Sequence, residues 1–159
     1  MNSSILKILV GLFLLGILTQ CGETAYYEKN IDLKASNWYA DSILTFKFKV
    51  DNANQKFDFF YNIRNTVKYP YYNLYVTYYL EDSKGKVLAT DLQNITLFDS
   101  KRGKPFGSGV SNIRTHQLEI ASLKKYKFPA KGSYIFKLKQ YMRQNPLNEI
   151  QMMGLRIEQ

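Results

Sequence analysis

The sequence is poor in the residues that build disulfides, metal sites and histidine-based catalysis. It has one cysteine, Cys21, so no disulfide can form within the chain. It has one histidine, His116, which excludes a metal site with two histidine ligands. A catalytic triad would need His116 as its base, but Gly107-Ser108-Gly109 lacks the spacing of a nucleophile elbow. We therefore expect His116 to be a surface residue near a strand end, and we expect neither enzymatic activity nor a cofactor.

Long apolar runs are also scarce, and the longest lies near the N-terminus. Residues 8–18 form eleven consecutive positions without a polar side chain, with Lys7 just before them. As a helix this run spans roughly 17 Å, whereas the hydrocarbon core of a bilayer is about 30 Å thick. A charged start, a short apolar core and a polar end are typical of a secretory signal peptide.

The position of Cys21 indicates a lipoprotein. In bacterial lipoproteins the cysteine that follows the apolar run receives a diacylglyceryl group and becomes the first residue of the mature chain. Gln20 stands where a small residue is usual in that pattern. The alternative is an ordinary secretory signal in which Cys21 is incidental. We predict a signal peptide over residues 1–20, lipid attachment at Cys21, and a lipidated tether over residues 21–36.

Acidic residues are few relative to basic ones. The chain has 22 Lys and Arg against 13 Asp and Glu, a net charge of +9, which falls to +8 when Lys7 leaves with the signal peptide. An exported basic protein favours anionic partners such as lipid head groups or an anionic envelope polymer, and we expect no nucleic acid partner. The remaining 139 residues suit a single domain with a sizeable core.

The rest of the sequence has the pattern of β-strands. Aromatic residues are abundant, with 13 tyrosines and 10 phenylalanines, and such residues favour strands. Apolar and polar side chains alternate, as in half-buried strands, over residues 44–50, 57–63, 74–80 and 134–138. Residues 117–123 fit either a strand or one helical turn, and we favour the strand. We predict an all-β fold, an antiparallel β-sandwich of jelly-roll or Ig-like type, over residues 37–159.

Two loops carry candidate partner-binding residues. Residues 69–72 place three tyrosines around Pro70, and tyrosine suits both protein hot spots and sugar stacking. The alternative is that these rings pack over the open end of the sandwich. Residues 101–109 form a glycine-rich basic loop. The candidate partner-binding residues are Arg64, Asn65, Tyr69, Tyr71, Tyr72, Lys101 and Arg102.

Three separated motifs resemble those of one protein family. They are Asn-Ile-Arg-Asn-Thr at 62–66 with Tyr-Pro-Tyr at 69–71, Phe-Pro-Ala-Lys-Gly-Ser-Tyr at 128–134, and Gly-Leu-Arg-Ile-Glu at 154–158. In this order, and with Trp38 before them, they resemble the gliding-motility lipoprotein GldH family of Bacteroidetes. The resemblance implies a lipid-anchored envelope protein of the gliding machinery, which shares components with type IX secretion. It implies no catalytic residue, and only the lipid-bearing cysteine carries over, to Cys21.

These observations predict a non-enzymatic lipoprotein that acts in gliding motility through contacts with other machinery proteins. No aspartate and no acidic run follows Cys21, which favours the periplasmic face of the outer membrane. One alternative is an envelope module that binds glycan or cell wall through its tyrosines. Another is an enzyme on a sandwich scaffold, which requires acids such as Asp58, Glu81 and Asp91 to meet in one cleft.

Overall fold

The protein is almost entirely β-structure, as predicted. A computed structural model describes residues 25–159. Its two helices are short 3-10 turns, η2 (Lys34–Ser36) and η3 (Ala121–Leu123). The strands are β1 (Tyr27–Asp32), β2 (Asn37–Trp38), β3 (Leu44–Val50), β4 (Asp58–Thr66), β5 (Asn73–Asp82), β6 (Val87–Thr96), β7 (Ile113–Glu119), β8 (Gly132–Gln140), β9 (Leu147–Asn148) and β10 (Ile150–Glu158).

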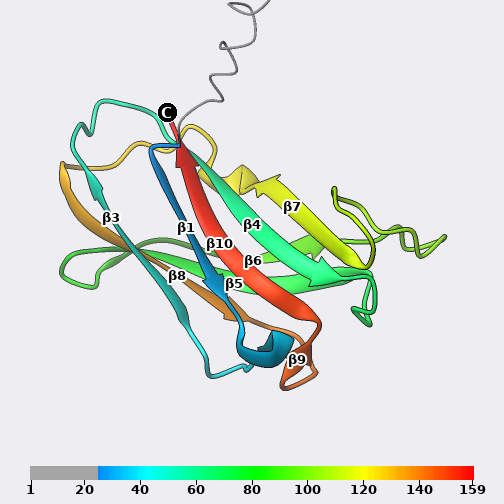
Figure 1. The fold of residues 1–159 in the computed structure, drawn as a ribbon. Coiled ribbons are helices and arrows are strands. Elements are labelled where there is room, and N and C mark those ends of the chain that lie inside the picture. Colours follow the sequence, from blue (N-terminus) through cyan, green and yellow to red (C-terminus); the bar gives the residue numbers. More distant parts are fainter. Residues whose placement is uncertain (1–24) are drawn as a thin grey trace, which may run out of the picture.

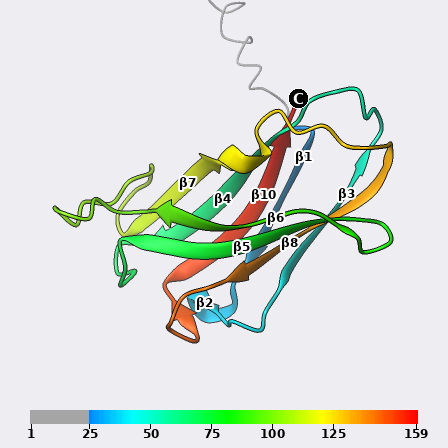
Figure 2. The same cartoon turned by 180° about the vertical axis from the view of Figure 1, so that it is seen from behind.

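The strands form two antiparallel sheets that face each other (Figures 1 and 2). One sheet has the order β1-β10-β4-β7, the other has the order β3-β8-β5-β6, and β2 pairs with β9 in a small ribbon. Apart from that ribbon, the eight strands pair from the outside of the chain inward: β1 with β10, β3 with β8, β4 with β7, and β5 with β6. This nesting is the strand order of a jelly roll, one of the two sandwich types that the sequence predicts.

Alternating side chains fill the space between the sheets. In β3, Phe46 and Phe48 point inward while Lys47 and Lys49 are exposed, as the period of two requires. Aromatic rings from both sheets interlock: Phe59 of β4 packs against Phe136 of β8 with ring centroids 6.0 Å apart. Each fully buried ring contributes roughly 2–3 kcal/mol. Residues 25–159 contain no cysteine, so this packing stabilises the sandwich without a disulfide.

The first strand begins earlier than predicted. Residues 27–32 belong to the expected tether, but they form β1 and pair with β10 from Tyr27↔Ile157 to Asp32↔Met152. Tyr27 and Ile31 pack against the core. Tyr27 and Ile31 are the only side chains of this edge strand that are partly buried, and the other four are exposed, which explains why its sequence looks polar. The expected boundary at residue 37 is therefore wrong, whereas Cys21 and the expected signal peptide lie outside the described residues.

The ambiguous segment at residues 117–123 contains both structures that its sequence allowed. Its first part completes β7, which ends at Glu119, and its second part is η3. Residues 87–96 form one continuous strand, β6, whose edge position leaves most of its side chains partly or fully exposed.

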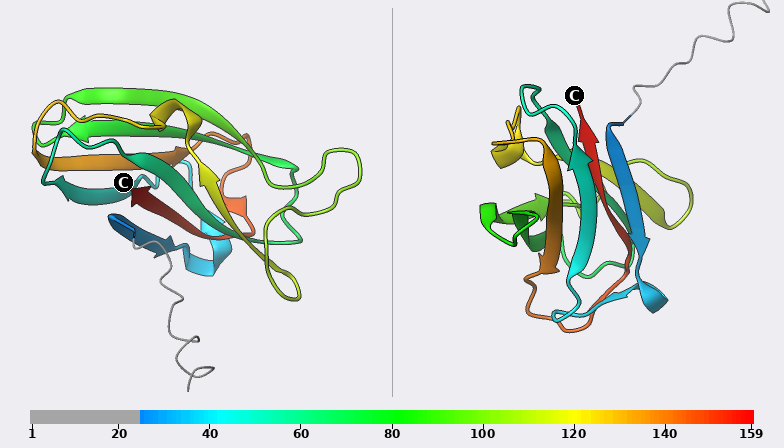
Figure 3. Two further views of the ribbon diagram at one scale, coloured as in Figure 1. Left: turned by 90° about the horizontal axis from the view of Figure 1, so that it is seen from above. Right: turned by 90° about the vertical axis from the view of Figure 1, so that its left-hand side faces the viewer.

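The strands define two ends of the sandwich (Figure 3). At the near end lie residue 25, the C-terminus, and the loops at residues 51–57, 83–86 and 120–131, because Tyr27 pairs with Ile157 and Val50 with Gly132. At the far end lie the loops at residues 33–43, 67–72, 97–112 and 141–149. The nine residues of β4 run from one end to the other, a length of about 30 Å.

Candidate functional site

An open groove lined by tyrosines lies at the far end of the β3-β8-β5-β6 sheet. Its volume is 760 Å³. Several of its large side chains face solvent: Tyr141 is 64% exposed, Tyr72 49% and Leu92 48%. Such a cluster of exposed apolar surface marks a binding site more often than a solitary exposed ring does. The lining residues are Tyr71, Tyr72, Asn73, Tyr75, Leu92, Tyr141, Met142 and Arg143.

Strand pairing fixes the floor of this groove. Val76 pairs with Gln140, the last residue of β8, so Tyr141 lies beside Tyr75. The Tyr141 N–H donates to the Tyr75 carbonyl at 2.8 Å, and the Tyr75 N–H donates to Met142 Sδ at 3.2 Å. The buried Gln140 side chain accepts from the Met142 N–H at 2.7 Å. The exposed rings therefore stand on a backbone that is already held in place, which lowers the entropy lost on binding.

The loop at residues 69–72 contributes one packing residue and one exposed residue. Tyr69 is buried, donates from its hydroxyl to the Asn73 carbonyl at 2.9 Å, and stacks on Phe98 with centroids 6.3 Å apart. Burial raises the pKa of Tyr69 above its ordinary value. Tyr71 donates to Gln144 Oε1 at 3.1 Å. Tyr69 is thus a packing residue, as the alternative interpretation of this loop expected, whereas the Tyr72 side chain remains exposed to solvent.

The basic loop adjoins the tyrosine loop. The N–H groups of Leu97 and Phe98 both donate to the Tyr72 carbonyl, at 2.8 and 2.9 Å. A turn follows in which Asp99 Oδ1 accepts from the backbone N–H groups of Lys101 and Arg102, at 2.8 and 3.0 Å. Both basic side chains are exposed. Lys101 and Arg102 therefore lie at the same end of the molecule as Tyr72, next to the groove but outside its lining.

Arg64 and Asn65 do not reach the groove. Asn65 is fully buried, and its Oδ1 accepts a hydrogen bond from Nε2 of His116 at 2.9 Å. The predictions that Asn65 contacts a partner and that His116 lies at the surface are both wrong, because the inward alternation of β4 and β7 continues through these polar residues. Burial, with a smaller effect of the Arg114 charge, lowers the pKa of His116 below 6.5. Arg64 is half-buried on β4, in the sheet opposite the groove.

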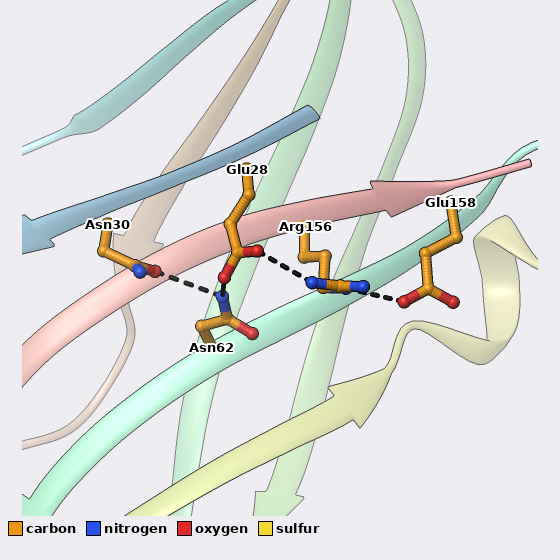
Figure 4. A network of polar contacts seen from close by, with 5 residues as sticks. All are labelled: Glu28, Asn30, Asn62, Arg156 and Glu158. Atoms are coloured by element: carbon orange, nitrogen blue, oxygen red, sulfur yellow. Dashed lines mark hydrogen bonds and ion pairs between the residues drawn. The ribbon is translucent and has the colours of Figure 1, made fainter. Parts of the chain in front are cut away.

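A polar network crosses the outer face of the other sheet (Figure 4). Arg156 of β10 donates to Glu28 at 2.8 Å and to Glu158 at 2.6 Å. Asn62 of β4 donates to Glu28 at 2.7 Å and to Asn30 at 3.1 Å, so side chains of β1 reach across β10. These hydrogen bonds connect side chains of β1, β4 and β10, and so link the three strands across the outer face of the sheet.

The acids of the described residues do not form a metal-binding cluster. Residues 25–159 contain no group of three or more His, Cys, Asp or Glu side chains that could hold a metal ion. The three acids proposed for an enzyme have separate partners. Asp58 accepts from the Lys125 backbone at 2.6 Å, Glu81 pairs with Lys137 at 2.8 Å, and Asp91 accepts from Gln93 at 2.5 Å. Within the same range no helix is long and apolar enough to cross a bilayer.

The fold and the groove define a class of protein: a jelly-roll domain with a tyrosine-lined groove at one end. The sequence model of the GldH lipoprotein family matches residues 25–157, and the chain belongs to this family. The chain is 25% identical to a gliding motility lipoprotein GldH homolog of Christiangramia forsetii, over 98% of this chain and 96% of that protein. It is 28% identical to the gliding motility lipoprotein GldH of Flavobacterium johnsoniae, over 90% of each chain.

Solved structures are only distantly similar. The VP2 protein of infectious bursal disease virus aligns with a TM-score of 0.35 at 12% identity. That alignment covers 85% of this chain and 30% of the viral chain. A likeness at this level says nothing about function.

Proposed function

We propose that this protein is a lipid-anchored component of the gliding motility machinery, linked to type IX secretion, that binds a partner protein through the tyrosine groove. Membership of the GldH lipoprotein family supports a lipoprotein of the cell envelope. The observation that carries the finer proposal is the groove, with its exposed Tyr72, Tyr75 and Tyr141. Cys21 carries the lipid, and the periplasmic face of the outer membrane is the proposed location.

The composition of the groove fits a protein partner. Tyrosine, methionine and arginine are enriched in protein interfaces, and Tyr72, Tyr141, Met142 and Arg143 all line the groove. The two exposed tyrosines offer large apolar area at low conformational cost, while Arg143 adds a positive charge for a partner carboxylate. A partner segment with apolar side chains beside an acidic one is complementary to this surface.

The position of the groove fits an anchored protein. The described chain begins at the near end, and the groove opens at the far end, about 30 Å away along β4. A lipid on Cys21 would therefore hold the opposite end of the domain at the membrane and leave the groove free. Lys101 and Arg102, at the far end beside Tyr72, would extend the contact to acidic groups of the partner.

The test is substitution of the two most exposed groove tyrosines in a gliding bacterium whose own family member is replaced by this one. Tyr72→Ala with Tyr141→Ala should abolish spreading on agar, since hot-spot tyrosines contribute about 2 kcal/mol or more each. Tyr39→Ala is the matched control, because Tyr39 is 49% exposed, like Tyr72, but does not line the groove. A photocrosslinker at position 141 should capture one partner. Normal spreading of the double variant would refute the proposed role of the groove.

Anchoring and location are tested separately. When membranes are washed in high salt, which screens contacts of basic side chains with lipid head groups, Cys21→Ala should move the protein from the membrane fraction to the soluble fraction. Density separation of the two membranes should find the wild-type protein with the outer membrane. Retention of the variant in membranes would overturn attachment through Cys21.

A glycan or cell-wall ligand is the second candidate, because exposed tyrosines also stack on sugars. Retention of the wild-type protein on peptidoglycan or lipopolysaccharide, lost with Tyr72→Ala and Tyr141→Ala, would favour it over a protein partner.

A further inference from the structure

The loops of the near end are strongly basic. Between them, the three loops at residues 51–57, 83–86 and 120–131 hold seven lysines and one aspartate, a net charge of +6. The far-end loops hold six basic and three acidic residues, a net charge of +3. The lysines of the near end are Lys56, Lys84, Lys86, Lys124, Lys125, Lys127 and Lys131.

The acids that flank these loops already have partners, among them Asp58, which accepts from the Lys125 backbone N–H at 2.6 Å. Asp51 pairs with Lys49 on β3 at 2.8 Å. Asp82 accepts from the backbone N–H groups of Lys84 and Lys86, at 2.8 and 2.9 Å, and so closes the β5–β6 turn. Glu119 pairs with Lys124 at 3.1 Å. Among residues 25–159, the other six loop lysines have no ion pair, and all six are exposed.

The start of the fold holds this end close to the proposed anchor. Because Tyr27 is already paired with Ile157, only six residue steps separate it from Cys21. Fully extended, six residues span at most about 20 Å. The tether is therefore much shorter than the sixteen residues expected for positions 21–36, and it cannot carry the near end far from the head groups.

We propose that the near-end lysines rest on the anionic lipid head groups of the membrane that holds the acyl chains. The inference depends on the proposed lipid attachment at Cys21. Lysines that lie within a Debye length of an anionic surface are attracted to its phosphates, and acyl chains combined with a basic patch form a two-part membrane signal. The contact would fix the tilt of the sandwich, so that the tyrosine groove at the far end points away from the bilayer.

The test measures vesicle binding without the anchor. Every strand lies within residues 27–158, so a chain of residues 22–159 keeps the whole sandwich and has no lipid. It should sediment with vesicles of phosphatidylcholine and phosphatidylglycerol at low salt, but not with phosphatidylcholine alone. Each lysine at an anionic surface contributes roughly fivefold to binding. Substituting Lys125, Lys127 and Lys131 by Gln should therefore weaken binding by about a hundredfold.

The matched control removes three exposed lysines from the far end. Lys34→Gln, Lys68→Gln and Lys104→Gln change the net charge equally, and this variant should bind the anionic vesicles almost as well as the wild type. Equal weakening in both variants would show an effect of total charge and would overturn the proposal. Binding that does not depend on phosphatidylglycerol would also overturn the proposal. Retention on lipopolysaccharide or peptidoglycan without any binding to vesicles would overturn it as well.

A second measurement uses the acylated full-length protein reconstituted in the same two kinds of vesicle. Amide hydrogens of residues 120–131 should exchange more slowly in anionic than in neutral vesicles, with no change at residues 97–112. Identical exchange in the two vesicles would refute the lysine contact. Because the sedimentation assay uses no lipid anchor and no gliding cell, its outcome is independent of the Cys21→Ala and groove experiments.

Discussion

Gly154 is the position at which one methyl group should loosen β1 from its sheet. Gly154 lies on β10 directly opposite Asn30 of β1. A Cβ atom at residue 154 would overlap Oδ1 of Asn30 and lie 2.9 Å from the carbonyl oxygen of Lys29. The missing side chain is what lets Asn30 cross β10 and meet Asn62 on β4 (Figure 4).

The expected cost of Gly154→Ala has three parts. Loss of the Asn62–Asn30 hydrogen bond costs about 1 kcal/mol. Displacement of the β1 backbone by an oversized side chain costs about 1–3 kcal/mol. Lower entropy of the unfolded chain offsets about 0.5–1 kcal/mol. We expect the free energy of unfolding to fall by about 2 kcal/mol.

Equilibrium unfolding in urea measures this cost, and a double-mutant cycle with Asn30→Ala identifies its origin. Once Asn30 lacks its amide, the overlap with Oδ1 is gone, so Gly154→Ala should cost about 1 kcal/mol less in that background. The contact with the Lys29 carbonyl remains and should leave a residual cost. Additive effects of the two substitutions would refute the role assigned to Gly154.

Three further predictions concern buried polar side chains. His116 takes up a proton more readily in the unfolded chain, because burial lowers its pKa below 6.5 in the folded protein. The stability of the wild type should therefore fall relative to that of His116→Gln as the pH drops below 6.5. A difference in stability between the two proteins that does not change with pH would contradict this. Tyr69→Phe should lose about 1 kcal/mol with its bond to the Asn73 carbonyl. Tyr61→Phe should be neutral or stabilising by up to about 1 kcal/mol, because the Tyr61 hydroxyl is buried without a partner among the described residues. Urea unfolding measures the change in stability for Tyr69→Phe and Tyr61→Phe, and a larger loss for Tyr61→Phe than for Tyr69→Phe would refute the reasoning.

The strands with regular alternation could be predicted from the sequence. Four strands bury mainly one face, namely β3, β4, β5 and β8. The alternation of apolar and polar residues along their sequences indicates this directly. β1 was missed because it is an edge strand whose single inward face includes a lysine at position 29. The burial of Asn65 and His116 could not be predicted from the sequence. The two side chains form a hydrogen bond with each other inside the sandwich, and a buried polar pair of this kind looks like exposed polar residues in the sequence.

The groove could not be predicted from the sequence, because the register between β5 and β8 brings its residues together. Tyr72 and Tyr141 lie 69 positions apart, and the β5–β8 pairing that joins them cannot be read from either segment alone. Composition points to the tyrosine loop, but it does not point to Tyr75, Tyr141 or Arg143. The signal that could have pointed to Tyr141 is its place directly after a strand that ends at the same end of the sandwich as that loop.

The pairing of β1 with β10 also bears on how the protein would carry load. Tension applied at Tyr27 and resisted at the far end runs along the axis of β1. All six residue pairs of β1 with β10 are then loaded together in shear, rather than opened one at a time. The Glu28–Arg156 and Asn30–Asn62 contacts resist the same sliding, because they cross-link the strands through side chains. A domain attached in this way would transmit a pull from its partner to the bilayer without first unzipping.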